Sequence, residues 1–86
     1  MYKVIFSRQA EKSLSKTPRD YQIKIRGLIR RLSINPFVFD LRKLGPKFTA
    51  THRLRYGPYR LFLHINTETK VVIIAEITRR TTQTYR

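Results

Sequence analysis

Residues 52–66 read HRLRYGPYRLFLHIN, the stretch of this chain with the clearest strand pattern. Polar and apolar residues alternate on both sides of Gly57-Pro58, a dipeptide that is typical of turns. The alternation predicts two strands, over 51–56 and 59–66. Because the connection between them is so short, the strands must run antiparallel.

The two faces of this strand pair differ in chemistry. Leu54 and Leu61 fall on one face, which we expect to lie against the core. Arg53, Arg55 and Arg60 then fall together on the opposite face. The sequence therefore predicts a sheet that displays three arginines side by side, away from its hydrophobic layer.

The residues before this strand pair predict a strand and a helical hairpin. The first segment is short, aromatic and β-branched, and the next two carry apolar residues at spacings of three and four. Pro18 separates the two helical segments. The expected elements are a strand over 2–6, a helix over 8–16 with Ser7 as its N-cap, and a helix over 19–33 that ends at Asn35-Pro36.

The remaining segments complete the predicted fold. Residues 37–49 read as irregular, and 71–77 form a nearly continuous apolar run that is typical of a central strand buried on both faces. We expect an α+β fold: an N-terminal strand, a helical hairpin and an antiparallel three-strand meander. The sheet and helices form two layers, with the helices on one face. Residues 1–86 are predicted to form a single domain.

The charge of the chain points to an anionic partner. Its 19 Lys and Arg residues against 5 Asp and Glu give a formal charge of +14. Between residues 41 and 67 there are six basic residues and no acid. Such a field suits nucleic acid or an acidic protein. These six residues are Arg42, Lys43, Lys47, Arg53, Arg55 and Arg60.

Several function classes are disfavoured by composition. The chain has no Cys and its acids are scattered, so we expect no metal site and no cofactor. No apolar run has membrane-spanning length, and the first residues read as a strand instead of a signal peptide. We therefore expect a cytoplasmic protein with no membrane partner.

Cleavage of RNA needs no metal, because the 2′-hydroxyl is a built-in nucleophile. Arginines stabilise charge on the phosphorus oxygens, and a tyrosine can exchange a proton or stack on a base. We expect one cleft to hold the arginines and the tyrosine of the strand pair and the C-terminal residues. This set is Arg53, Arg55, Arg60, Arg79, Arg80 and Tyr85.

The chain resembles the RelE/ParE superfamily of toxins over almost its full length. The resemblance rests on Val4-Ile5-Phe6-Ser7, on Asn35-Pro36, on residues 52–61 and on the C-terminal pattern of Thr78-Arg79-Arg80 followed by Tyr85. It implies the toxin of a type II toxin–antitoxin system, with a cognate acidic antitoxin as partner. The RelE branch comprises ribosome-dependent endoribonucleases that cleave messenger RNA in the ribosomal A site.

The resemblance also implies roles for individual residues. Arg53 and Arg55 match two basic positions before the turn, Arg60 matches the arginine after it, and Arg79 and Tyr85 match the terminal pair. These five are the expected catalytic residues. The expected RNA-binding residues are Arg42, Lys43, Lys47 and Arg80.

The chain differs from many relatives at some of these positions, and other functions remain open. Some relatives have Lys where this chain has Arg53 and Arg55, and many have His where it has Thr78. Arg scarcely deprotonates, so the proton-transfer role falls to Tyr85 or His64.

The alternative functions are a ParE-like inhibitor of DNA gyrase and a non-enzymatic basic RNA-binding protein. Without the resemblance, Arg53 and Arg55 also fit a solvated strand face.

Overall fold

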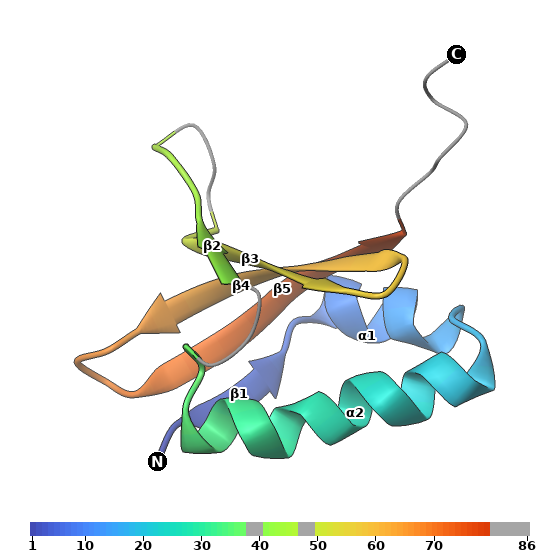
Figure 1. The fold of residues 1–86 in the computed structure, drawn as a ribbon, viewed down its shortest axis with the longest axis horizontal. Helices are drawn as coiled ribbons and strands as arrows, with labels where there is room; N and C mark the ends of the chain where they lie inside the picture. Colours follow the sequence, from blue (N-terminus) through green and yellow to red (C-terminus); the bar gives the residue numbers. More distant parts are fainter. Residues whose placement is uncertain (38–40, 47–49, 80–86) are drawn as a thin grey trace.

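The computed structural model describes residues 1–37, 41–46 and 50–79. In these residues two helices pack on a five-stranded sheet (Figure 1). The elements in chain order are β1 (Lys3–Phe6), α1 (Arg8–Ser15), α2 (Arg19–Ile34), β2 (Leu41–Lys43), β3 (His52–Tyr56), β4 (Tyr59–Asn66) and β5 (Val71–Arg79).

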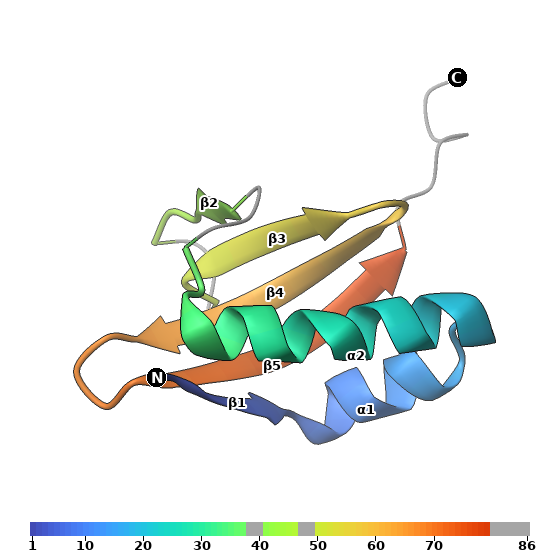
Figure 2. The ribbon, with the colours of Figure 1, turned by 60° about the horizontal axis from the view of Figure 1, so that its bottom comes forward.

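The strand order across the sheet is β1-β5-β4-β3-β2. Strands β3, β4 and β5 form the antiparallel meander that the sequence predicts, and β1 joins β5 in parallel. The α1–α2 hairpin comes directly after β1 and covers one face of the sheet (Figure 2). The predicted α+β class, element order and two-layer arrangement are confirmed.

Local sequence signals explain where the helices begin and which side they bury. The Ser7 side chain accepts a hydrogen bond from the Ala10 amide at 3.0 Å, which makes it the N-cap of α1. In α2 the buried residues are Ile25, Leu28 and Leu32, which fall on the predicted apolar face.

The hydrophobic core lies between the helices and one face of the sheet. Leucine, isoleucine and valine from β4 and β5 meet the apolar sides of both helices there. In the residues that the structure describes, no helix covers the opposite face of the sheet (Figure 1). The core consists of Ala10, Leu14, Ile25, Leu28, Leu32, Leu54, Tyr59, Leu61, Leu63, Ile65, Val72, Ile74 and Ile77.

Strand β5 corrects one prediction, because it is not buried on both faces. Ile73 is 37% exposed, whereas Val72 and Ile74 are fully buried. The pairing with β4 shifts by one residue along the strand and leaves Ala75 as an extra residue, which makes a β-bulge. The alternation changes phase at the bulge, so that Ile77 faces the core together with Val72 and Ile74.

A short strand also appears where the sequence predicts irregular structure. Strand β2 pairs antiparallel with β3 and places Leu41 opposite Leu54. Three residues, Leu-Arg-Lys, carry no strand periodicity of their own. This strand forms because β3 offers an unpaired backbone edge, which is a property of the assembled sheet.

In the ranges that the structure describes, neither helix is long and apolar enough to cross a membrane.

Candidate functional site

The open face of the sheet gathers four of the predicted site residues. Arg55 pairs with Arg60 across the β3–β4 hairpin, and Arg42 pairs with Arg53 across β2 and β3. Directly opposed residues point to the same side of a sheet. We call Arg42, Arg53, Arg55 and Arg60 the arginine face.

Two like-charged pairs in opposed positions are unfavourable for a sheet taken alone. Opposed like charges destabilise a strand pair. In the described residues, Arg60 also has a buried Nε without a hydrogen-bond partner. Unfavourable arrangements of this kind persist at sites that bind a ligand of opposite charge.

The turn at Gly57 sets the geometry of the Arg55–Arg60 pair. Gly57 has a φ of +59°, a conformation that glycine adopts without strain. A Cβ at this position would also lie 3.2 Å from a ring carbon of Tyr21. The Tyr21 ring in turn contacts Tyr59 edge-to-face at 5.2 Å. Helix α2 therefore presses on the hairpin from the core side and holds its tip.

The open face also carries an acid that sequence reasoning did not single out. Glu76 pairs with Phe62, which pairs with Arg53 on its other side. The bulge turns Glu76 to this face, two residue pairs along the ladder from Arg60 and its partner Thr78. Five scattered acids offer no signal for this placement, because it depends on the bulge. Glu76 thus adds a carboxylate to a basic surface.

His64 lies on the same face but further along β4. It pairs with Ile73, and it is four residues from Arg60. At a strand rise near 3.3 Å per residue, the two Cα atoms are roughly 13 Å apart. His64 is therefore not adjacent to the Arg55–Arg60 pair.

Arg79 corrects the expectation of one common cleft, because it lies on the helix side of the sheet. It pairs with the buried Tyr59, and its guanidinium carbon lies 5.9 Å from the centre of the Tyr59 ring. An uninterrupted alternation from Val72 would have placed Arg79 on the open face. The bulge at Ala75 reverses the phase and moves Arg79 to the other side.

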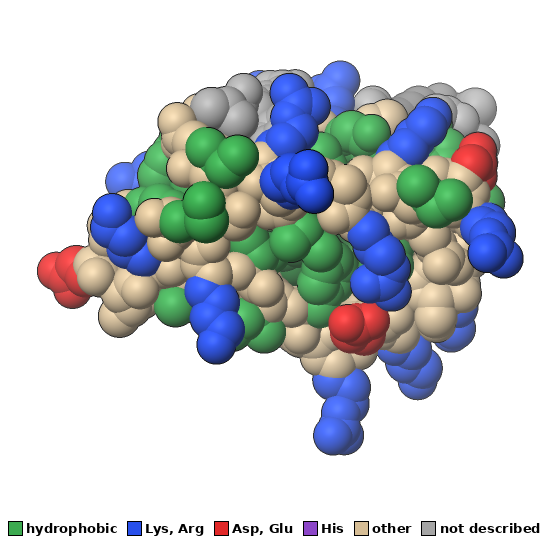
Figure 3. Space-filling model, turned by 90° about the horizontal axis from the view of Figure 1, so that it is seen from below, with side chains coloured by type: hydrophobic (Ala, Val, Ile, Leu, Met, Phe, Trp, Pro, Cys, Tyr) green, Lys and Arg blue, Asp and Glu red, His purple; other side chains and the backbone are tan. Residues whose placement is uncertain are grey.

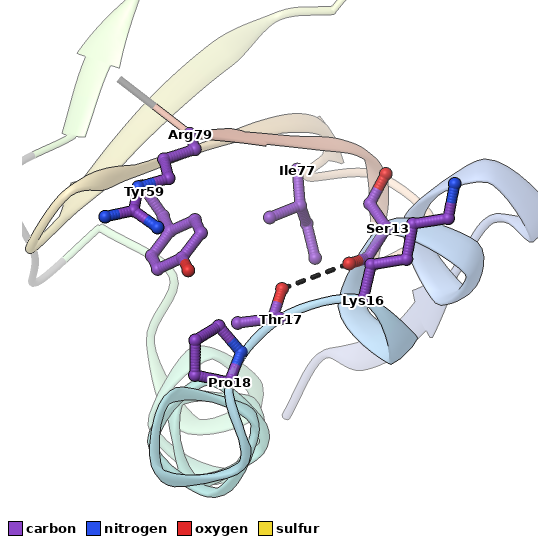
Figure 4. Close-up of a pocket in the computed structure, with 7 residues that line it drawn as sticks. All are labelled: Ser13, Lys16, Thr17, Pro18, Tyr59, Ile77 and Arg79. Carbon is purple, nitrogen blue, oxygen red and sulfur yellow. Dashed lines mark hydrogen bonds between the residues drawn. The ribbon is translucent and has the colours of Figure 1, made fainter. Parts of the chain in front are cut away.

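On that side Arg79 borders a pocket of about 230 Å³ (Figure 4). The pocket lies between the end of β5 and the connection from α1 to α2. Lys16 and Thr17 form its other wall, and the Thr17 hydroxyl donates a hydrogen bond to the Ser13 carbonyl at 3.0 Å. Arg79 is thus separated by the sheet from the arginine face.

The remaining predicted residues fall into two groups. Lys43 pairs with His52, on the side of the sheet that faces the helices, so it is not part of the arginine face. Burial and the nearby charge of Lys43 lower the pKa of His52. Lys47, Arg80 and Tyr85 lie outside the described residues.

Among residues 1–37, 41–46 and 50–79, no three His, Cys, Asp or Glu side chains are placed to hold a metal ion.

A family comparison covers nearly the whole chain. Residues 4–83 match the family described as "ParE toxin of type II toxin-antitoxin system, parDE". The chain belongs to this toxin family. None of the curated proteins compared with the chain matches its sequence.

Solved structures place the toxin within the RelE/ParE superfamily and give it a RelE-like fold. A chain of the RelBE2 toxin–antitoxin complex from Mycobacterium tuberculosis is 28% identical, with a TM-score of 0.81 over 92% of this chain and 98% of that chain. A chain of the archaeal RelE-RelB complex from Pyrococcus horikoshii OT3 is 26% identical, with a TM-score of 0.82 over 94% and 97%.

The isolated RelE toxin of E. coli shares the fold at a lower level of identity. It is 16% identical, with a TM-score of 0.78 over 99% of this chain and 92% of that chain. The predicted membership of the RelE/ParE superfamily, with a RelE-like fold, is therefore confirmed.

Proposed function

We propose that this toxin is a metal-independent endoribonuclease that cleaves messenger RNA in the A site of the ribosome and so inhibits translation. The observation that carries the proposal is the pairing of Arg55 with Arg60 and of Arg42 with Arg53 on a face without a helix. A phosphodiester backbone carries the negative charge that complements a surface with four arginines and one carboxylate. The RelE-like fold supports the same direction.

The reaction follows from the chemistry of RNA. The 2′-oxygen attacks the adjacent phosphorus, the bond to the 5′-oxygen breaks, and the products are a 2′,3′-cyclic phosphate and a 5′-hydroxyl. Negative charge grows on the non-bridging oxygens during this step. Arg60 and Arg55 are the residues that we assign to stabilise it, because preorganised guanidinium groups keep their charge and geometry.

A proton must leave the 2′-hydroxyl and another must reach the 5′-oxygen. Tyr85 and His64 remain the candidates from the sequence, and the structure adds Glu76, two residue pairs along the β4–β5 ladder from Arg60. We propose that the ribosome supplies the alignment of substrate and nucleophile, which is the entropic part of the barrier. Arg53 and Arg42 then act mainly in holding the RNA backbone.

The proposal is tested by cleavage of messenger RNA on programmed ribosomes. EDTA is present, in a buffer that keeps the ribosomes intact by other means. Arg60→Ala should lower the single-turnover rate by about 100- to 1000-fold, the usual effect of losing one preorganised charge at a developing oxyanion. Lys12→Ala, which removes one charge from the exposed side of α1, is the matched control and should cleave normally. Full activity of a folded Arg60→Ala variant would reject the assignment.

The position of Arg79 gives this test a second arm. The sequence pairs Arg79 with Arg60 as a catalytic residue, but the sheet lies between them. We therefore expect Arg79→Ala to cost less activity than Arg60→Ala. An equal loss would mean that the active site extends round the end of β5.

Inhibition of DNA gyrase is the second candidate function, favoured by the family whose pattern spans residues 4–83. A supercoiling assay with the same preparations separates the two. Inhibition of gyrase that survives Arg60→Ala, together with intact messenger RNA, would establish the second function in place of the first.

We also propose an acidic antitoxin, encoded beside the toxin, as the cognate partner in the cytoplasm. The formal charge of +14 and the toxin–antitoxin complexes among similar structures support this partner. Co-expression with the neighbouring small open reading frame should restore growth and yield a complex. A neighbour that neither binds nor restores growth would count against it.

A further inference from the structure

The outer side of α2 carries an unusual stripe of residues. Ile23, Gly27, Arg30 and Ile34 follow each other at spacings of four, three and four, which places them on one side of the helix. This side is opposite to the buried residues of α2. Ile23 is 65% exposed and Ile34 is 63% exposed. We call these four residues the Gly27 face.

Gly27 has no role in the packing of the toxin itself. It lies in the middle of α2, where glycine is the least favourable residue apart from proline. A Cβ built on it would meet nothing within 4 Å. Alanine would therefore fit and would strengthen the helix. A glycine that the interior does not need permits close approach of another backbone from outside.

Cations frame the two isoleucines. Arg19, Arg26 and Arg30 are exposed on this side of α2. Arg26 forms a weak ion pair with the exposed Glu11 at 3.8 Å, and its guanidinium carbon lies 6.0 Å from the centre of the Phe6 ring. Figure 3 views the helix layer and shows separate hydrophobic patches among Lys and Arg side chains. An apolar stripe with a basic border matches a helix that is apolar on one side and acidic at its edges.

We propose that the Gly27 face is the docking site for an acidic amphipathic helix of the antitoxin, which crosses α2 at Gly27. This inference rests on the proposed antitoxin partner and adds the surface that it binds. A second copy of this chain fits poorly, because its own arginines would oppose those of the first copy. RNA fits poorly as well, because its backbone offers no apolar partner to Ile23 and Ile34.

The test uses Gly27→Ala and Gly27→Gln in the full-length toxin, with the antitoxin polypeptide of the neighbouring reading frame as the probe. Both variants should raise the Tm of the free toxin by about 4 °C or more, because they replace a mid-helix glycine. Gly27→Gln should nevertheless weaken antitoxin binding by at least about tenfold, because its side chain holds the partner away. Gly27→Ala should weaken binding less.

Opposite signs in the two readouts separate docking from folding, since a merely structural role would not combine higher stability with weaker binding. Lys12→Gln, which introduces the same side chain on exposed α1, should leave the Kd unchanged. Toxicity of the free variants should also stay at the wild-type level, because the Gly27 face is remote from the arginine face.

Four results would overturn the inference. Wild-type affinity of Gly27→Gln would place the antitoxin elsewhere and leave the proposed partner standing. Reduced toxicity with unchanged antitoxin binding would assign the face to the ribosome. Toxin dimers that Gly27→Gln dissociates, with unchanged antitoxin binding, would assign it to a second copy. A wild-type toxin that does not bind the neighbour would reject the partner itself, while the cleavage assay still judges the proposed activity.

Discussion

Single residues on the open face divide the proposed chemistry between them. Arg55 and Arg60 lie opposite each other in the hairpin, and Glu76 on β5 is two residue pairs along the ladder from Arg60. A carboxylate at this place offers a possible acceptor for the proton of the 2′-hydroxyl. At this scale the question is which side chain takes the 2′-hydroxyl proton.

Paired substitutions at Glu76 and Tyr85 answer that question. We expect Glu76→Gln, which keeps the shape and removes the charge, to lower the single-turnover rate by at least about tenfold, the low end for a positioned acid or base. Tyr85→Phe is the companion variant. A loss confined to Tyr85→Phe would transfer the role to the tyrosine, and retained activity of both would direct attention to His64.

His52 gives a prediction about pH and stability. Burial and the charge of Lys43 lower the pKa of His52 below 6.5 in the folded protein. The unfolded chain then binds a proton more readily, so the free energy of unfolding falls as the pH drops below about 6.5. Thermal unfolding between pH 7.5 and 5 should show this loss, and His52→Gln should make it smaller. An unchanged pH dependence in His52→Gln would contradict the expectation.

At the scale of elements, the bulge in β5 decides which side chains reach which face. Ser7 secures it from the neighbouring strand end: its amide donates to the Ile74 carbonyl at 2.9 Å and its hydroxyl donates to the Ala75 carbonyl at 2.7 Å. The same hydroxyl caps α1 through the Ala10 amide. One residue therefore links the helix start to the phase of β5.

Ser7→Ala should show both consequences. Loss of an N-cap costs about 1 kcal/mol of stability, and release of the Ala75 carbonyl adds to this. Because the bulge also orients Glu76, we expect messenger-RNA cleavage to fall even at temperatures where the variant is fully folded. Ser15→Ala, which removes only a local hydrogen bond at the end of α1, is the control. Normal cleavage by folded Ser7→Ala would show that the bulge holds without this contact.

The turn of the β3–β4 hairpin depends on Gly57. Gly57→Ala places a side chain at positive φ and pushes it against the Tyr21 ring. We expect a loss of roughly 1–2 kcal/mol in the free energy of unfolding, and a lower cleavage rate because the Arg55–Arg60 pair shifts. Urea titration measures the first effect. Gly45→Ala, where a Cβ meets nothing within 4 Å, is the control and should be milder.

For the molecule as a whole, the net positive charge affects both the stability of the fold and the choice of partners. The formal charge is +14, because 19 Lys and Arg residues stand against 5 Asp and Glu. The ion pair between Arg26 and Glu11 is exposed, with 3.8 Å between the charged atoms. Repulsion among cations therefore opposes folding more than ion pairs support it. The same field draws the toxin to RNA and to an acidic partner.

Salt should therefore act in opposite directions on stability and on binding. We expect the Tm of the free toxin to rise between about 50 and 500 mM NaCl, because the Debye length shortens from more than 10 Å to a few ångströms. Affinity for RNA should fall over the same range, with a slope that Arg53→Ala makes shallower. A Tm that falls with NaCl would show that unrecognised ion pairs stabilise the fold.

The helices, the hairpin and the class of fold could be predicted from the sequence, because they follow from local periodicity, capping and turn residues. The limits of β4, the cap at Ser7 and the buried side of α2 were all readable in this way. The arginine face was readable too, since regular alternation holds through Arg53, Arg55 and Arg60.

Strand β2 and the bulge in β5 could not be predicted from the sequence, because they depend on contacts between elements. Strand β2 exists because β3 offers it an edge, and the bulge at Ala75 exists because β5 must satisfy β4 on one side and β1 with Ser7 on the other. A bulge adds one residue to one strand, and no local pattern in a nearly continuous apolar run reveals where. That single residue sends Arg79 to the helix side and Glu76 to the open face, because side chains alternate with a period of two.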